Sequence, residues 1–169
     1  MHIHVRYIQT RKASLKYAPQ MPALSVGDAM PSTTLLGEQG LMQLRDRIGK
    51  PLVVYFYPAD ETPGCTKEAC SFRDQYQDFQ AAGAEVIGIS HDDQSSHEKF
   101  KANHRLPFTL LSDPKNAVAK AWGIIGFMGL PKRVTFVFDK AGIVRHRFDS
   151  LIRAGAHVDN ALAIVKTLA

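Results

Sequence analysis

The amino-acid sequence predicts an α/β domain with a central mixed β-sheet that is flanked by helices. Two continuous apolar runs, residues 52–57 and 85–90, have the composition of strands that are buried on both faces of a sheet. Between these runs, apolar residues recur at helical spacing. Strand-like runs that alternate with helices indicate parallel strands joined by helical crossovers.

The predicted elements have recognisable start and stop signals. Thr62 and Pro63 have the N-cap and first-turn preferences that open a helix, and Gly83 ends it. Asp113 and Pro114 open another helix. The expected strands are 33–36, 41–44, 52–57, 85–90, 108–111, 134–138 and 143–148, and the expected helices are 62–83, 95–103, 113–122 and 156–168.

From residue 52 onward the predicted order is β-α-β-α-β-α-β-β-α, which fits a thioredoxin-like fold. No linker divides the chain, so we expect one domain over residues 23–169. A poorly ordered N-terminal extension is expected over residues 1–22. Trp122 is expected as a core aromatic residue that could also report redox changes by fluorescence.

The positive charge of the chain is concentrated near its N-terminus. The net charge is +5, but residues 1–20 hold four basic side chains and no acidic one. The remaining 17 basic and 16 acidic residues disfavour a nucleic-acid-binding body. No window approaches the roughly 20 uncharged apolar residues of a membrane helix. Residues 1–20 lack the apolar core of a secretory signal and weakly resemble an organellar transit segment, with Met21 as an alternative natural start. We therefore expect a cytoplasmic protein, with an organelle as the alternative.

Cys65 lies where a reactive thiol is expected. It follows the carboxyl end of a predicted central strand, the edge at which open α/β sheets bind ligands, and it falls in the first turn of a helix. The partial positive charge of a helix N-terminus favours the thiolate, which is the nucleophilic form. The alternative is a buried structural cysteine, although such a residue more naturally lies within a strand or a helix.

Cys70 lies five residues further along the same predicted helix. In a regular helix the two Cα atoms would be about 8.7 Å apart, beyond the reach of about 7 Å for a disulfide. A disulfide would therefore require the helix to unwind, and the alternative is a Cys70 that faces the core. The spacing is not CxxC, and no compact Cys/His spacing indicates a zinc site. His91, His97 and His104 are expected at the surface or at helix ends.

The stretch YPADETPGCTKEAC contains the pattern P-x-x-x-T-x-x-C, formed by Pro58, Thr62 and Cys65. The pattern resembles the peroxiredoxin signature, and the longer stretch resembles the Q-type peroxiredoxins, also called bacterioferritin-comigratory proteins. The resemblance runs from residue 24 to the end and includes Arg133 and the late His157. It departs from the family pattern at residues 123–132, where a longer and more polar segment is expected.

The resemblance implies a thiol peroxidase that reduces hydrogen peroxide and organic hydroperoxides. Cys65 would attack the peroxide and become a sulfenic acid, and Cys70 would condense with it to an intrachain disulfide. Thr62 and backbone amides would hold the peroxide, Arg133 would supply positive charge, and Pro58 would exclude water from the pocket. The resemblance also implies recycling by thioredoxin or a similar dithiol, a monomer, and no metal or organic cofactor.

Simpler roles stay open for the supporting residues. Pro58 could only end a strand, Thr62 could only cap a helix, and Arg133 could lie at a solvated strand edge. Glu68 could orient Arg133 or only favour the helix dipole. A non-catalytic alternative is a redox-controlled interaction protein, in which unwinding of the helix exposes apolar surface. A weaker alternative is nucleic-acid binding through residues 1–20.

Overall fold

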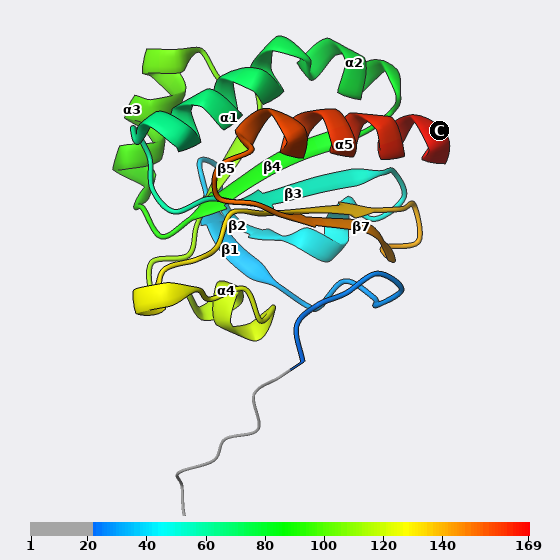
Figure 1. Cartoon of the computed structure of the whole chain (residues 1–169), viewed down its shortest axis with the longest axis horizontal. Coiled ribbons are helices and arrows are strands. Elements are labelled where there is room, and N and C mark those ends of the chain that lie inside the picture. Colours follow the sequence, from blue (N-terminus) through cyan, green and yellow to red (C-terminus); the bar gives the residue numbers. More distant parts are fainter. Residues whose placement is uncertain (1–21) are drawn as a thin grey trace, which may run out of the picture.

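The computed structural model of the chain describes residues 22–169 (Figure 1). The expected extension over residues 1–22 lies almost wholly outside this part of the chain and stays a prediction. Residues 22–169 contain a seven-stranded sheet with the strand order β2-β1-β5-β4-β3-β6-β7. The strands are β1 (Thr34–Gly37), β2 (Gly40–Gln43), β3 (Leu52–Phe56), β4 (Glu85–Ser90), β5 (Thr109–Ser112), β6 (Val134–Phe138) and β7 (Val144–Asp149).

The sheet is mixed, as predicted. Strands β3, β4 and β5 are parallel, whereas β6 runs antiparallel to β3 and forms a hairpin with β7. Helices α1, α2, α3 and α5 cover one face of the sheet, and α4 lies on the other (Figure 1). The helices are α1 (Pro63–Asp74), α2 (Tyr76–Ala81), α3 (Gln94–His104), α4 (Ala117–Ala121) and α5 (Ala154–Leu168), with the 3-10 turns η1 (Leu44–Arg47) and η2 (Phe127–Gly129).

Strand β3 divides its side chains between two hydrophobic cores, because successive residues of a strand point to opposite faces. Val53 and Tyr55 join the core beneath α1, α2, α3 and α5, called here the α1-side core. Val54 and Phe56 join the core next to α4, called here the α4-side core. All of these side chains are buried, which explains the continuous apolar run in the sequence.

The prediction of one long helix over residues 62–83 is wrong in one respect, because the segment forms two helices, α1 and α2. Gln75, with φ −102° and ψ 9°, interrupts it between α1 and α2. The break leaves Phe72 and Phe79 fully buried in the same core with their ring centroids 5.7 Å apart. No glycine or proline marks this position, so no local signal in the sequence indicates the break.

The helix predicted over residues 113–122 is shorter than expected and begins at Ala117. Asp113 stays outside it, and its carboxylate accepts hydrogen bonds from the backbone amides of Val118 and Ala119 at 3.2 and 3.0 Å. Asn116 takes a left-handed conformation before the first turn. Asp113 therefore caps the amides of the first turn although it lies four residues before the helix begins, which the sequence alone did not indicate. Trp122 is buried in the α4-side core, as expected.

The expectation that His97 lies at the surface is wrong. His97 is the fourth residue of α3, near the N-terminal end of the helix as expected, but it is only 1% exposed. Its Nδ1 lies 2.8 Å from a carboxylate oxygen of Asp60, and its Nε2 lies 3.2 Å from the carbonyl oxygen of Leu111. These partners make burial of the imidazole tolerable. His104 is the last residue of α3, as expected.

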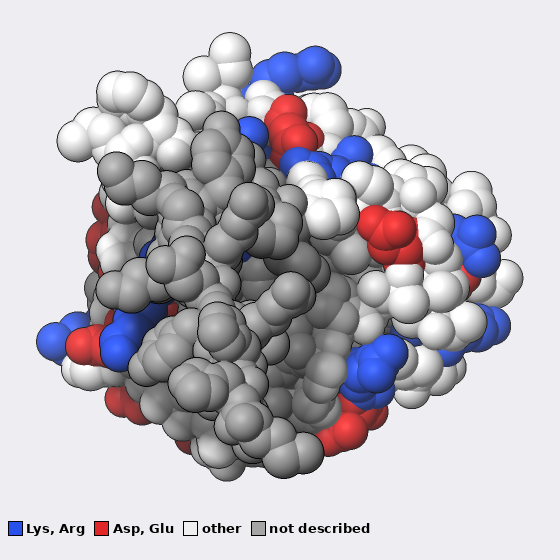
Figure 2. Space-filling model, turned by 90° about the horizontal axis from the view of Figure 1, so that it is seen from below, with Lys and Arg blue, Asp and Glu red and all other residues white. Residues whose placement is uncertain are grey.

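The surface of the described residues carries mixed charge in the view of Figure 2. Lys and Arg side chains alternate there with Asp and Glu over the part of the face that residues 22–169 form. Within those residues, no helix is both long and apolar enough to span a bilayer. The same part of the chain holds no group of three His, Cys, Asp or Glu side chains arranged to bind a metal ion.

Candidate active site

Cys65 is the third residue of α1, directly after the loop that leaves β3. The helix starts as the sequence predicts, with Thr62 extended at the N-cap (φ −77°, ψ 147°) and Pro63 at the first helical position. The Thr62 carbonyl accepts the amide of Thr66 at 2.8 Å. The Cys65 thiol is therefore held at the N-terminus of a helix, and it is 2% exposed.

Arg133 reaches this thiol because of the register between β3 and β6. Phe56, the last residue of β3, pairs with Val134, the first residue of the antiparallel β6. Arg133 directly precedes Val134, so it lies beside the loop that carries Cys65. Its Nη2 donates a hydrogen bond to the Cys65 Sγ at 3.3 Å. A Cβ on Gly64 would come within 3.0 Å of Nη2, so the glycine leaves room for the guanidinium.

Glu68 orients the guanidinium, which is the first of the two roles left open above. Arg133 Nη1 donates a hydrogen bond to Glu68 Oε2, and both side chains are buried. Arg133 Nε also donates to the carbonyl oxygen of Leu151 at 3.3 Å. Glu68 lies three residues after Cys65, which places the two side chains on one face of the helix. That spacing is the sequence signal that indicates Glu68 as a site residue.

Glu68 is fully buried and has few further hydrogen-bond partners. Its Oε1 has no hydrogen-bond partner and lies 3.6 Å from His157 Nδ1. His157 Nε2 donates to the Ser150 carbonyl at 2.8 Å, so in the neutral ring Nδ1 accepts from the Thr135 hydroxyl at 2.8 Å. Burial lowers the pKa of His157, which favours this neutral ring. Burial raises the pKa of Glu68 to about 8, although Arg133 acts to lower it.

Replacing Glu68 by glutamine is expected to change how folding stability depends on pH. Because the pKa of Glu68 is raised from 4.5 to about 8, the folded protein keeps a proton that the unfolded chain has lost. The contribution of Glu68 to wild-type stability should therefore fall as pH rises from 4.5 to about 8, by an amount on the order of a few kcal/mol. Urea unfolding at several pH values measures it, and Glu68→Gln should lack this part of the slope.

The matched control is Glu98→Gln, which changes an exposed glutamate of α3 and should keep the wild-type slope. Equal slopes in the wild type and Glu68→Gln would show that Glu68 is already ionised in the folded protein.

Thr62 and Pro58 lie in the loop between β3 and α1, and both are half-buried. The Thr62 hydroxyl donates to the Ala59 carbonyl at 3.0 Å and does not cap the helix with its side chain. Pro58 follows the fully buried Tyr57 at the end of the β3 region. The structure thus brings Cys65 and Arg133 into direct contact, and it places Thr62 and Pro58 in the same loop without a contact between their polar atoms and the thiol.

Cys70 is half-buried, and both cysteines are free. Helix α1 runs without interruption from Pro63 to Asp74 and contains both of them. Regular helical geometry separates their Cα atoms by about 8.7 Å, which a disulfide cannot span. This arrangement is the folded, reduced state, and a Cys65–Cys70 bond requires the first half of α1 to unwind.

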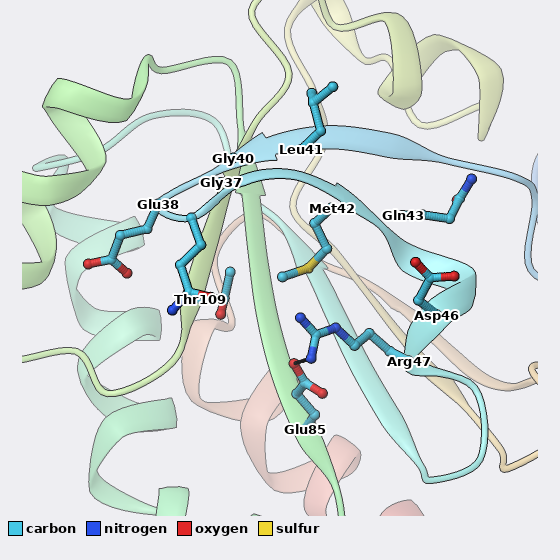
Figure 3. A pocket seen from close by; sticks show the side chains of 11 residues that line it. Gly37, Glu38, Gly40, Leu41, Met42, Gln43, Asp46, Arg47, Glu85 and Thr109 are labelled. Atoms are coloured by element: carbon cyan, nitrogen blue, oxygen red, sulfur yellow. Dashed lines mark ion pairs between the residues drawn. The ribbon is translucent and has the colours of Figure 1, made fainter.

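A separate pocket of about 540 Å³ lies away from the cysteines, at the β1–β2 hairpin (Figure 3). It includes Glu85 and Thr109, which begin the parallel strands β4 and β5, whereas Cys65 follows the opposite, carboxyl ends of the parallel strands. Arg47 and Glu85, which both line it, form an ion pair with 3.8 Å between Nη1 and Oε1 (Figure 3). This pocket does not contribute to the chemistry of Cys65.

Comparison with known proteins places the chain in a family. The AhpC/TSA family profile matches residues 26–147. The chain is 51% identical over 145 residues to "Peroxiredoxin Q, chloroplastic" of Populus jackii, which covers 84% of this chain and 68% of the relative. It is also 47% identical over 165 residues to the protein of the same name from Suaeda salsa, covering 96% of this chain and 75% of the relative.

The chain is a Q-type peroxiredoxin of the AhpC/TSA family.

Solved peroxiredoxin structures agree with this assignment. Peroxidoxin BcpB of Mycobacterium tuberculosis is 37% identical, with a TM-score of 0.80 over 86% of this chain and 99% of that one. The bacterioferritin comigratory protein of Xanthomonas campestris is 32% identical, with a TM-score of 0.75 over 83% of this chain and 98% of that one. The thioredoxin-like peroxiredoxin fold predicted from the sequence is thereby confirmed.

The segment where this peroxiredoxin departs from the family pattern, residues 123–132, forms a closed loop. An isolated bridge between Ile125 and Pro131 holds its ends together, and η2 lies at its tip. Phe127 and Met128 are 90% and 81% exposed there. Arg133 follows directly, so the shape of this loop does not prevent the guanidinium from reaching Cys65.

Proposed function

We propose that Cys65 is the peroxidatic residue of this thiol peroxidase. The observation that carries the proposal is the 3.3 Å contact between Arg133 Nη2 and the Cys65 Sγ in a buried site. A guanidinium at this distance stabilises a thiolate by Coulomb attraction, and the attraction is strong because little water is present to screen it.

The first step is a two-electron oxidation of sulfur. The Cys65 thiolate attacks the distal oxygen of the peroxide, and the O–O bond breaks. Sulfur becomes a sulfenic acid, and the other oxygen leaves as alkoxide or hydroxide, which takes up a proton to give an alcohol or water. Arg133 stabilises the negative charge that develops on the leaving oxygen.

The other loop residues support this step. Thr62 holds the peroxide by its hydroxyl, which gives up its bond to the Ala59 carbonyl or shares it. Pro58 limits water access at the end of β3. Glu68 keeps the guanidinium oriented, so it is a positioning residue.

Cys70 completes the oxidative half of the cycle. After α1 unwinds, the Cys70 thiolate attacks the Cys65 sulfenic sulfur, and water leaves once a proton is supplied. A dithiol reductant of the thioredoxin kind then restores both thiols by two successive exchanges. Sulfur atoms carry all the electrons, so these steps need no metal or organic cofactor. Because both cysteines belong to one chain, a monomer suffices.

The relatives extend the proposal to substrate and location. The bacterioferritin comigratory protein of Xanthomonas campestris is described as having alkyl peroxide reduction activity, which supports organic hydroperoxides beside hydrogen peroxide as substrates of this chain. The plant relatives are named chloroplastic, which is compatible with the organelle alternative. They give no support to the expected cytoplasmic location.

Adding one equivalent of hydrogen peroxide to the reduced protein tests the mechanism. Thiol counting and intact mass should show the loss of two thiols and of about 2 Da in a single chain, which is the Cys65–Cys70 disulfide. A gain of about 16 Da with one thiol left would mean that Cys70 does not resolve the sulfenic acid. No reaction would overturn the proposal in favour of a redox-controlled interaction protein.

A further inference from the structure

The loop between β3 and α1 is attached to α3 by two carboxylate–histidine pairs. Asp60 Oδ2 lies 2.8 Å from His97 Nδ1, and Glu61 Oε2 lies 2.8 Å from His104 Nε2. The two histidines are seven residues apart, about two helical turns, and therefore face the same side of α3. We call these four residues the loop clamp.

The Asp60–His97 pair is the stronger half of the loop clamp. The two side chains are 2% and 1% exposed. His97 Nε2 lies 3.2 Å from the Leu111 carbonyl oxygen, so both ring nitrogens have a polar partner. Asp60 also accepts hydrogen bonds from the Tyr57 and Ser96 hydroxyls, each at 2.7 Å.

Asp60 is held in its carboxylate form. Burial acts to raise the pKa of Asp60, but the hydrogen bonds from His97, Tyr57 and Ser96 outweigh burial and lower it. The backbone amide of Asp60 is fixed as well, because it donates to an Asp92 carboxylate oxygen at 2.8 Å. Asp60 therefore holds its segment of the loop through both its side chain and its backbone.

The second half of the loop clamp holds a strained residue. Glu61 has φ +58°, a left-handed conformation that costs energy for a residue with a Cβ. Its two carboxylate oxygens are bound by Asn103 Nδ2 and His104 Nε2, each at 2.8 Å. Opening this contact would let the backbone of Glu61 relax, so the strain favours release once the clamp is weakened.

None of the hydrogen bonds of the loop clamp involves Cys65 or Arg133, and yet the clamp bears on their chemistry. It fixes the chain immediately before Thr62, where α1 begins. The proposed disulfide requires α1 to unwind from this end, because Cys65 has to approach Cys70. A segment held at its start is harder to unwind than a free one.

We propose that the loop clamp sets the rate at which the Cys65 sulfenic acid is converted to the disulfide. The inference rests on the proposed function and names four positioning residues for it. A tight clamp keeps the folded, peroxide-reactive form, and it also prolongs the life of the sulfenic acid. A second peroxide then has time to add an oxygen to that sulfur, which gives a sulfinic acid and another alcohol or water. The clamp thus raises the susceptibility to overoxidation, and it leaves the first oxidation step unchanged because the reduced site is already folded.

Two substitutions of graded strength test this inference. Asp60→Asn removes the buried charge from the Asp60–His97 pair, and it should raise the rate of disulfide formation about tenfold. Glu61→Gln weakens the more exposed pair, and it should raise that rate about twofold. Glu98→Gln, on the exposed side of α3, is the matched control and should change nothing.

The measurement separates the two oxidation steps. Reduced protein is mixed with hydrogen peroxide, quenched with an alkylating agent at successive times and weighed intact, so that thiol, disulfide and sulfinic forms are counted. The variants should lose thiols to the first peroxide at the wild-type rate, form the disulfide faster, and yield less sulfinic acid at high peroxide. A general loss of stability would not lower the sulfinic fraction while the first step stays intact.

The outcomes distinguish this inference from the function on which it rests. If the wild type forms the disulfide and both variants match its rate and its sulfinic yield, the loop clamp does not control the step. If Asp60→Asn fails to fold, the exposed Glu61→Gln still decides the question. If the wild-type chain itself forms no disulfide, the proposed function falls, and this inference falls with it.

Discussion

Replacing Cys65 by serine is expected to abolish peroxide turnover, whereas replacing Cys70 by serine should leave one turnover per chain. A serine hydroxyl next to Arg133 is not ionised near neutral pH, so Cys65→Ser has no nucleophile at the helix N-terminus. The Cys70→Ser variant keeps the contact between Arg133 and the Cys65 sulfur and loses only the resolving thiol. We would measure peroxide consumption with a thioredoxin system present, once with stoichiometric and once with catalytic amounts of each variant. These assays show whether a variant has no turnover or a single turnover.

The Cys70→Ser protein should stop as a sulfenic acid that a small external thiol can reduce. This rescue is the control, because it shows that the first half of the cycle is intact. Turnover by Cys65→Ser at a rate near that of the wild type would contradict the assignment of Cys65 as the peroxidatic residue.

Replacing Arg133 by methionine should slow the first oxidation step by about 10²–10³-fold, the usual effect of losing an oriented group that stabilises transition-state charge. Methionine occupies similar volume but brings neither the Nη2 contact to Cys65 nor a charge for the leaving oxygen. The rate of thiol loss at limiting peroxide measures this step directly, without contributions from resolution or recycling.

Two companion variants separate charge from packing. Arg133→Met leaves the buried, protonated Glu68 carboxyl without its hydrogen-bond partner, so the double variant Arg133→Met/Glu68→Leu, which removes that polar group, should recover stability without recovering the rate. Arg133→Lys keeps the charge but cannot bind Cys65 and Glu68 together as the planar guanidinium does. Its rate of the first oxidation step should lie between those of the wild type and Arg133→Met. If Arg133→Met keeps the wild-type rate, the prediction is wrong, and the N-terminus of α1 alone stabilises the thiolate.

The strands and the start of α1 were predictable because their signals are local, whereas the helix expected from Asp113 begins only at Ala117. The apolar run at β3 and the Thr62–Pro63 start of α1 both appear where the sequence places them. The break at Gln75 was not predictable, since no glycine or proline marks it. The buried state of His97 was missed for a related reason, because its partner Asp60 lies 37 residues away in the chain.

In the candidate site, too, local features were predictable and contacts between distant residues were not. The P-x-x-x-T-x-x-C pattern identifies the loop of Pro58, Thr62 and Cys65 from neighbouring residues alone. The contact of Arg133 with Cys65 spans 68 residues and depends on the antiparallel register of β3 with β6. Only the family resemblance pointed to Arg133, because no local pattern carries information about that register.

The separation of the two cores by the sheet has an optical consequence. Trp122 is the single tryptophan of the chain, and its ring centroid lies 5.3 Å from those of Phe56 and Phe136 in the α4-side core. Cys65 and the rest of α1 pack in the α1-side core on the opposite face. The indole is thus screened by a layer of strands from the helix that changes during the cycle. We therefore expect its emission to follow the melting of the sheet and to change little when the cysteines change their oxidation state, unlike the redox reporter expected from the sequence.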